Sequence, residues 1–266
     1  MTISKTAKEL FANKGGIEKH NLNNVLQLLS QNDDHQETFA TSNYYDIESM
    51  LKSFKKKKCD FSLLTLNIDG INTKYNELTA FLRQLDDENF TFSAILLQET
   101  RLSDDDCKSD YIKIFNIPNY ELISQGYKCG RKGGLIIYLH ELYKGTCKNI
   151  YKESKDWEGM FIDVTSPLLK NKIILGNVYR PPRDNYSNKS IDNFLKPFEE
   201  ILVSLKNENC SIIIGGDFNI NLLQLDARDK FQEYFDLFLT NNLLPEITLP
   251  TRFSKKICDA YRSNLL

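Results

Sequence analysis

Three short runs of aliphatic residues constrain the fold of this chain most strongly, because each one leads directly to polar side chains. The run SIIIGGDFN leads to Asp217 and Asn219. Two other runs, SAILLQET and FSLLTLN, lead to Glu99 and Asn67. Aliphatic and β-branched runs of this length are typical of central strands that are covered on both faces in layered α/β proteins. We therefore expect these polar residues at the carboxyl ends of buried strands, where open α/β sheets place their ligands.

The chemistry of these strand ends suits a hard cation. Asp217 and Asn219 are two positions apart, so both side chains leave the same face if the extended conformation persists. Cations such as Mg²⁺ prefer a few carboxylate and carbonyl oxygens and keep part of their water. Asn67, Glu99 and Asp217 would therefore suit Mg²⁺ if the fold gathers them at one sheet edge. The alternative interpretation is that each residue separately caps a helix or stabilises a turn.

Further hydrophobic patterns predict the remaining elements. Apolar stretches bounded by turn-forming residues predict strands, and apolar residues repeated every three or four positions predict amphipathic helices. Pro197 is expected in the first turn of its helix or at a bend, because proline lacks the N–H that a helix interior uses. Strands outnumber helices, so we expect packed sheets with helices outside. The expected strands contain YELIS, GGLIIYL, MFIDV and KIILGNVY, and the expected helices cover KYNELTAFLRQLDDE, residues 192–205 and ARDKFQEYFDLFLTNN.

Length and composition favour one large domain with an N-terminal appendage. The chain has 266 residues, of which 41% are hydrophobic and 11% aromatic, so it can bury a substantial core. Residues 1–58 are polar, and we expect them to form a weakly ordered extension. Residues 59–266 are expected to form the domain. The lysine run in FKKKKCD, at this boundary, is interpreted as a solvated charge run, with a nuclear-import signal or a phosphate contact as the alternative.

Charge, cysteine content and hydropathy limit the class of protein. The formal net charge of -2 does not favour a polyanionic partner, although a local basic groove is compatible with it. The six cysteines form no C-x-x-C pair, and MTISKTAKELFANKGG lacks the apolar core of a secretory signal, so we expect reduced thiols in an intracellular protein. No apolar stretch approaches the roughly 20 residues that span a bilayer, so we expect no membrane partner. No stable protein partner is predicted.

Several motifs together resemble a known family. The chain contains, in this order, LLTLNIDGI, ILLQETRL, KGGLIIYL, LGNVYRPP, IIIGGDFNIN and LPTRFS. Over residues 44–259 it resembles the endonuclease/exonuclease/phosphatase superfamily, and most of all the endonuclease domain of non-LTR (LINE-type) retrotransposons. The NVYRPP block favours this branch over relatives that hydrolyse abasic DNA, phosphoinositides or sphingomyelin. The resemblance implies a DNase I-like α/β fold, a four-layer sandwich of two packed mixed sheets flanked by helices, which hydrolyses phosphodiesters in DNA.

The resemblance also implies roles for individual residues. Glu99 would be the principal ligand of Mg²⁺, or of Mn²⁺ as an alternative, with Asn67 beside it in the metal shell. Such a cation polarises the phosphoryl oxygen and stabilises the leaving oxyanion. Asp217 would orient or deprotonate the attacking water, whereas Asn219 and the Tyr179 hydroxyl would contact the phosphate. Without the family, Tyr179 would be interpreted as a core tyrosine with a satisfied hydroxyl.

The matches on the phosphate side are weaker. Thr251 corresponds to a hydroxyl that contacts the phosphate in the family. Arg180 and Arg252 each either pair with phosphate or anchor a loop through an internal carboxylate, and the sequence leaves both interpretations open. The basic residues of GYKCGRKGG and YRPPRD are candidate DNA contacts, which would meet backbone phosphates without reading base sequence. A solvated hairpin loop is the alternative interpretation.

The last motifs of the family are not matched. After PTR the family continues with an acidic residue, for which Asp259 is the candidate, and ends in an SDH motif whose histidine faces the position of Asp217. The sequence instead ends in LPTRFSKKICDAYRSNLL. We therefore expect a truncated domain that lacks its last strands. Losing a positioned donor or base costs about two to four orders of magnitude in rate, so we expect impaired catalysis unless another chain completes the site.

Three other functions compete with DNA hydrolysis. A catalytically inactive remnant of the same fold could act as a binding protein, and a hydrolase of the same fold could act on a small phosphoester. The run SIIIGGD also imitates the strand and aspartate that hold Mg²⁺ in P-loop ATPases. That class requires a G-x-x-x-x-G-K-[ST] loop upstream, and the sequence contains none.

Overall fold

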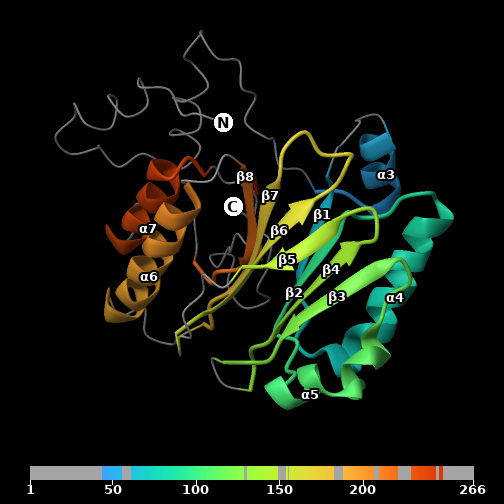
Figure 1. The fold of residues 1–266 in the computed structure, drawn as a ribbon, viewed down its shortest axis with the longest axis horizontal. Helices are drawn as coiled ribbons and strands as arrows, with labels where there is room; N and C mark the ends of the chain where they lie inside the picture. The colour runs from blue at the N-terminus through green and yellow to red at the C-terminus, as the bar shows by residue number, and fades with distance from the viewer. Residues whose placement is uncertain are drawn as a thin grey trace, which may run out of the picture. The chain divides into compact units, whose positions relative to one another are not determined.

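The computed structural model describes residues 44–55, 61–128, 131–148, 154, 156–182, 188–206, 210–220, 229–243 and 246–247. Contacts within the chain divide it into two compact units, which are described separately. The larger unit comprises residues 44–182 and 209–218 and contains both β-sheets (Figure 1). In chain order the elements are α3 (Ile47–Lys55), β1 (Leu63–Asn67), α4 (Ile71–Asp87), β2 (Ala94–Gln98), α5 (Asp104–Lys108), η1 (Asp110–Phe115), β3 (Tyr120–Gln125), β4 (Leu135–His140), β5 (Lys144–Cys147), β6 (Glu158–Thr165), β7 (Ile173–Tyr179), α6 (Asn188–Lys206), β8 (Ser211–Asp217) and α7 (Asp229–Thr240).

Two mixed four-stranded sheets form the larger unit. The first sheet has the strand order β1-β2-β4-β3, and the second has the order β5-β6-β7-β8. In each sheet one pair is parallel, β1 with β2 and β7 with β8, and the other pairs are antiparallel. The parallel pairs bring the carboxyl ends of two strands to the same edge of each sheet. These edges are where the polar strand ends were expected.

The two sheets pack face to face through one set of alternating side chains. Leu96 and Ile137 of the first sheet belong to the same buried cluster as Ile162 and Leu175 of the second sheet. All four side chains are completely buried. Burying aliphatic side chains of this size contributes about 1.5–3 kcal/mol each, so this cluster is a principal source of stability. The α/β arrangement of two packed mixed sheets with helices, predicted from the sequence, is confirmed.

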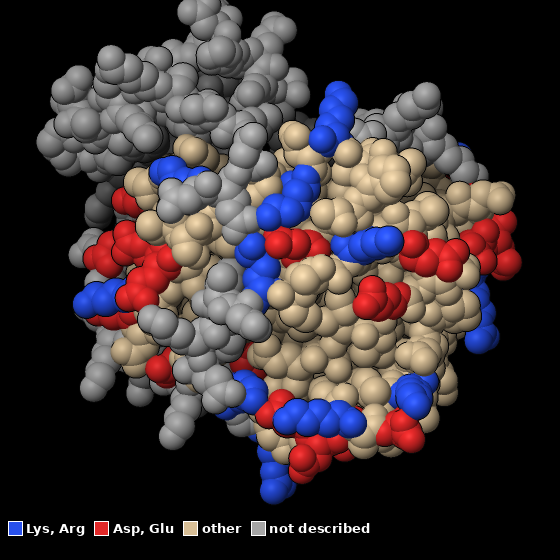
Figure 2. Space-filling view, in the orientation of Figure 1, with Lys and Arg blue, Asp and Glu red and all other residues tan. Residues whose placement is uncertain are grey.

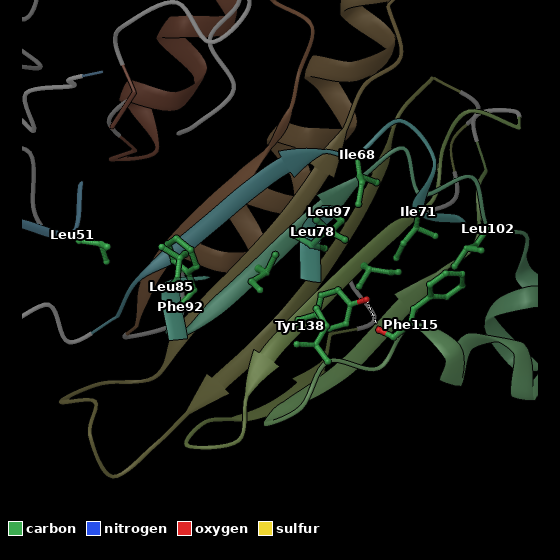
Figure 3. Close-up of a cluster of buried hydrophobic side chains, with 13 residues drawn as sticks. Leu51, Ile68, Ile71, Leu78, Leu85, Phe92, Leu97, Leu102, Phe115 and Tyr138 are labelled. Atoms are coloured by element: carbon green, nitrogen blue, oxygen red, sulfur yellow. Dashed lines mark hydrogen bonds between the residues drawn. The ribbon is translucent and has the colours of Figure 1, made fainter. Parts of the chain in front are cut away.

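The outer face of the first sheet packs against α4. Figure 3 shows this cluster, in which Leu97 and Tyr138 from the sheet lie near Leu78 from the helix. The Tyr138 hydroxyl donates a hydrogen bond of 2.7 Å to the Phe115 carbonyl, so its only polar atom is satisfied. The helix begins at Ile71, one turn earlier than its sequence pattern indicated, and its buried residues keep the predicted spacing.

Helix α3 lies within the segment that the sequence assigned to the N-terminal extension. Its Leu51 is only 6% exposed and belongs to the same cluster as the residues of α4. Residues 47–55 are therefore ordered against the larger unit, in contrast to the expectation of weak order for residues 1–58. The helix was not predicted although Ile47, Met50, Leu51 and Phe54 follow the spacing of an amphipathic helix, because residues 1–58 were interpreted as one polar segment. Residues 1–43 lie outside the described residues, and the domain boundary at residue 58 stays a prediction.

Helices α6 and α7 of the other unit pack through aromatic side chains. Phe194 and Phe198 stack with ring centroids 5.0 Å apart, and Phe198 lies 5.5 Å from Phe238 by the same measure. The inward face of α6 consists of five buried apolar residues at helical spacing, Phe194, Phe198, Ile201, Leu202 and Leu205. The first position expected for Pro197 is wrong, because the helix begins at Asn188 and Pro197 lies in its interior; a bend at Pro197 stays a prediction. The described helices include none that is both long and apolar enough to span a membrane.

Candidate active site

The ends of three neighbouring strands place a row of polar side chains on the inner face of the second sheet. Tyr179 ends β7 and is paired with Glu158 of β6 on one side and with Asp217 of β8 on the other. Residues directly opposite each other on paired strands project from the same face. Tyr179 belongs to the cluster between the sheets, so all three side chains face the first sheet. Their exposed fractions are 0% for Glu158 and Tyr179 and 4% for Asp217.

Asn67 joins this row to the first sheet. It is the last residue of β1, and Glu99 is the first residue after β2. The Asn67 amide donates one hydrogen bond of 2.8 Å to Glu99 Oε1 and another of 2.9 Å to Asp217 Oδ2. Two carboxylates from different sheets are thus within reach of one NH₂ group. The structure brings together the three residues that the sequence assigned to a cation site.

The donor set fits a magnesium ion. Mg²⁺ is usually held by one or two carboxylates and keeps several waters, and Glu99 with Asp217 supplies two. The Asn67 oxygen instead accepts a hydrogen bond of 3.2 Å from the Asp69 N–H. Direct ligation by Asn67 would therefore require its amide to rotate. No group of three or more His, Cys, Asp or Glu side chains in the described part of the chain is arranged to hold a metal.

Tyr179 presents its hydroxyl to these carboxylates. Burial raises the pKa of the phenol above its usual value, and the negative charge of Glu99 raises it further, followed by that of Asp217 and Glu158. The hydroxyl is buried and makes no hydrogen bond of standard geometry to the described residues, although Glu99 is near enough to disfavour the phenolate. Tyr179 therefore stays protonated at neutral pH and has a proton available to donate.

Several residues beside the site adopt left-handed backbone conformations. Asp69, Glu99 and Arg101 have φ angles of 50°, 54° and 61°. This region is unfavourable for residues such as Glu and Arg, so the surrounding contacts must hold them there. Arg101 forms an ion pair with Asp69 at this edge. Two strained residues flank Thr100, and the first of them carries the candidate cation-binding carboxylate.

Asn219 does not follow the expected alternation with Asp217. Strand β8 ends at Asp217, and Asn219 has a φ of 49°. The extended backbone on which the expected common face of Asp217 and Asn219 depended does not persist, because asparagine tolerates the left-handed region and the chain turns there. Asn219 is 1% exposed. Its proposed contact with phosphate stays a prediction.

Arg180 lies inside the structure. Its side chain is 1% exposed, and its Nη1 donates a hydrogen bond of 3.2 Å to the Phe218 carbonyl. Its backbone N–H donates to the Asp217 carbonyl at 2.9 Å. Arg180 therefore contacts the backbone at the end of β8 through the Phe218 carbonyl, and its pairing with phosphate or with an internal carboxylate stays a prediction. Thr251, Arg252 and Asp259 lie outside the described residues, and their roles stay predictions.

The candidate DNA-contacting residues differ in accessibility. Lys128 forms an ion pair of 2.5 Å with Asp104, whereas Arg131 and Lys132 are exposed. Arg183 lies outside the described residues. On the face shown in Figure 2, Lys and Arg are interspersed with Asp and Glu. Among the described residues of these two motifs, Arg131 and Lys132 are therefore exposed cations, and Lys128 is ion-paired.

The sequence did not predict a buried hydrogen bond between Gln98 and Asn177, which precede Glu99 and Tyr179 along the chain. Gln98 Nε2 donates a hydrogen bond of 2.7 Å to Asn177 Oδ1. The Asn177 amide in turn donates to the Leu97 and Ile136 carbonyls, each at 3.0 Å. These bonds tie β7 of the second sheet to β2 and β4 of the first. The only sequence signal was a single amide inside each of two otherwise apolar runs.

Replacing Asn177 by alanine is expected to lower the free energy of unfolding by about 2–3 kcal/mol, because it leaves buried hydrogen-bonding groups unpaired and removes side-chain volume. Urea unfolding followed by circular dichroism measures this change. The matched control is Asn76→Ala on the exposed face of α4, which is expected to change stability by less than about 0.5 kcal/mol. Equal effects of the two substitutions would show that the contact between the sheets is unimportant.

The two packed four-stranded sheets with their helices form a DNase I-like α/β fold, which this chain shares with solved structures of low sequence identity. An AP endonuclease from Leishmania major is similar with a TM-score of 0.57 and 14% identity, over 77% of this chain and 78% of that chain. An endonuclease/exonuclease/phosphatase family protein from Bacteroides thetaiotaomicron has a TM-score of 0.51 and 13% identity, over 77% and 81%.

A mannosyl-6-phosphatase from Bacteroides thetaiotaomicron is similar with a TM-score of 0.50 and 12% identity, over 77% of this chain and 84% of that chain. At these identities the likeness shows the shared fold. No protein-family model matches the sequence, and the comparison with curated proteins gave no match.

Proposed function

We propose that this chain is a Mg²⁺-dependent phosphodiester hydrolase that nicks DNA. The observation that carries the proposal is the Asn67 amide, which holds Glu99 and Asp217 together although Asn67 and Asp217 are 150 positions apart. A sheet edge that gathers two carboxylates beside a protonated tyrosine has the groups that phosphoester hydrolysis needs. Mg²⁺ bound there would polarise the phosphoryl oxygen and stabilise the leaving oxygen.

The side chains divide the remaining chemistry among them. Asp217 accepts a proton from the attacking water or orients that water, since its Oδ2 already accepts a hydrogen bond from Asn67. The Tyr179 hydroxyl donates a hydrogen bond to a phosphate oxygen, because its raised pKa keeps the proton in place. Glu99 supplies the principal carboxylate for the cation. Asn219 is assigned to the phosphate on the family resemblance alone.

DNA is the preferred substrate for two reasons. The motifs resemble LINE-type endonucleases, with NVYRPP as the distinguishing block. The fold is also similar to that of an AP endonuclease. The second candidate is a small phosphoester, which the similarity to a mannosyl-6-phosphatase supports. We infer a retrotransposon origin and an intracellular, including nuclear, location from the sequence motifs.

A substrate panel tests the proposal. The purified full chain is incubated with supercoiled plasmid, with a duplex containing an abasic site, with a generic phosphodiester and with a phosphomonoester, each with MgCl₂ or with EDTA. The expected result is Mg²⁺-dependent conversion of supercoiled to open-circular plasmid. Cleavage of the phosphomonoester alone would favour the second candidate. Turnover of none of the four substrates would favour the inactive binding protein, and the same assay decides whether catalysis is impaired.

A further inference from the structure

A buried glutamate that the proposed chemistry does not use holds a hairpin beside the site. Glu158 is fully buried at the start of β6. Its Oε1 accepts a hydrogen bond of 2.6 Å from the Lys128 N–H, and its Oε2 accepts one of 2.7 Å from the Gly134 N–H. These two amides belong to residues 126–128 and 131–134, the two described parts of the connection between β3 and β4, here called the 126–134 hairpin. One carboxylate of the second sheet thus fastens both parts of a hairpin of the first sheet.

The same hairpin supports the segment that carries Glu99. This segment follows β2 and runs beside the hairpin before α5 begins. Three backbone hydrogen bonds join them: Thr100 N–H to the Gly134 carbonyl at 3.1 Å, Arg101 N–H to the Gly133 carbonyl at 2.8 Å, and Tyr127 N–H to the Leu102 carbonyl at 2.9 Å. The residues immediately after Glu99 are therefore positioned by the hairpin that Glu158 holds.

Two adjacent glycines of the hairpin, Gly133 and Gly134, show how closely the parts fit. A Cβ atom on residue 133 would lie 2.0 Å from Glu158 Oε1, and one on residue 134 would lie 2.4 Å from Thr100 Oγ1. Gly134 also has a φ of +95°, which a residue with a side chain rarely adopts. The hairpin thus contacts Glu158 on one side and Thr100 on the other, and neither contact leaves room for a side chain on these glycines. A carboxylate displaced toward the hairpin would therefore collide with Gly133.

We propose that Glu158 is a positioning residue for Glu99, acting through the 126–134 hairpin. Glu99 is held in a left-handed conformation that costs of order 1–3 kcal/mol and persists only where neighbouring contacts enforce it. Those contacts include the hydrogen bonds of Thr100 and Arg101 to the hairpin, beside the bond of 2.8 Å that the Glu99 carbonyl accepts from the Gly70 N–H. The inference rests on the proposed function only in taking Glu99 as the cation ligand. The contact chain itself is independent of that function.

The competing interpretation is that Glu158 only stabilises the hairpin. In that case, replacing Glu158 would lower the melting temperature and loosen the hairpin. The backbone amides around Glu99 would exchange hydrogen at the wild-type rate, and the affinity for Mg²⁺ would not change. In the proposed role both of these properties change. Outer residues that orient metal ligands typically affect metal affinity by about 10–100-fold.

Glu158→Gln is the test substitution, because glutamine keeps the size of the side chain. The carboxamide has one oxygen and one NH₂ group, so it cannot accept from both backbone amides. Hydrogen exchange followed by mass spectrometry is expected to show faster exchange in residues 99–102 as well as in the hairpin. Titration calorimetry with MgCl₂ is expected to show a dissociation constant raised by about 10–100-fold. Faster exchange in the hairpin alone, with residues 99–102 and the Mg²⁺ affinity unchanged, would overturn the proposal.

Two further variants complete the experiment. Tyr138→Phe removes a buried hydrogen bond on the opposite face of the first sheet, and it is expected to lower stability without changing exchange at residues 99–102 or Mg²⁺ affinity. Glu158→Asp keeps both carboxylate oxygens, so its residues 99–102 are expected to exchange more slowly than those of Glu158→Gln. If Glu158→Gln does not fold, the aspartate variant carries the same comparison with the wild type. If the wild-type chain binds no Mg²⁺, the proposed function fails, and the exchange data still decide the role of Glu158.

Discussion

Replacing Asp217 by asparagine is expected to slow phosphodiester hydrolysis by about two to four orders of magnitude while leaving the fold intact. The carboxamide has the shape of the carboxylate and can still present an oxygen to the Asn67 amide, which lies 2.9 Å from Asp217 Oδ2. It carries no negative charge and is a poor proton acceptor. Initial rates at saturating MgCl₂, on the substrate that the panel identifies, measure the loss.

The matched control for this substitution is Asp110→Asn. Asp110 is exposed and forms a surface ion pair with Lys113 at 2.6 Å, and such pairs contribute at most about 1 kcal/mol. This variant is expected to retain the wild-type rate. The melting temperature of both variants is compared with that of the wild type, so that unfolding is not mistaken for lost chemistry. A wild-type rate for Asp217→Asn would remove Asp217 from the proposed mechanism.

Replacing Gly216 by alanine is expected to destabilise the protein by more than about 3 kcal/mol, which is a large part of the about 5–15 kcal/mol that stabilises an ordinary domain. Gly216 has a φ of +152°, and a Cβ atom there would lie 1.8 Å from the Val178 carbonyl oxygen. Val178 is its partner on β7, so the clash is with the backbone of a central strand and no side chain can move to relieve it. Thermal unfolding of the purified variant, or its yield in the soluble fraction, measures the effect.

Gly145→Ala is the appropriate comparison. A Cβ atom on Gly145 would lie 3.0 Å from the nearest atom, a methyl group of Leu139, and its neighbours are flexible side chains. Small shifts of these side chains relieve the contact, so we expect a change of less than about 1.5 kcal/mol. If Gly216→Ala is no more destabilising than Gly145→Ala, then the approach of β7 and β8 is looser than the structure shows.

Elements with strong hydrophobic signals could be predicted from the sequence. Strand β2 is almost entirely aliphatic, β7 is completely buried with four aliphatic residues in seven, and α4 and α6 have clear apolar faces, so burial explains their conformations. Strand β5, with the sequence KGTC, was not predicted because it contains almost no apolar residues. It exists because β6 offers an edge with which it can pair. Its conformation is therefore set by tertiary contacts that local sequence does not encode.

The candidate site could be predicted only in part. Asn67, Glu99 and Asp217 were found because each follows a long aliphatic run, and the family resemblance supported the same residues. Asn177 was missed because one amide inside an apolar run gives no indication of its partner. That partner, Gln98, is 79 positions away and lies on the other sheet. Glu158 was missed because its hydrogen-bond donors are backbone N–H groups, and a sequence does not indicate which backbone groups a side chain contacts.

The hydrogen bonds from the Asn67 amide to Glu99 and Asp217 have a consequence for the order in which contacts form during folding. The two ends of the bond to Asp217 come from β1 and β8, which are separated by nearly the whole of both sheets along the sequence. Closing so long a loop is entropically costly until each sheet has formed, so this contact belongs to the last stage of folding. A nascent or partly folded chain therefore lacks the arrangement of Glu99 and Asp217 around the Asn67 amide. The proposed hydrolytic activity is expected only in molecules in which both sheets have formed.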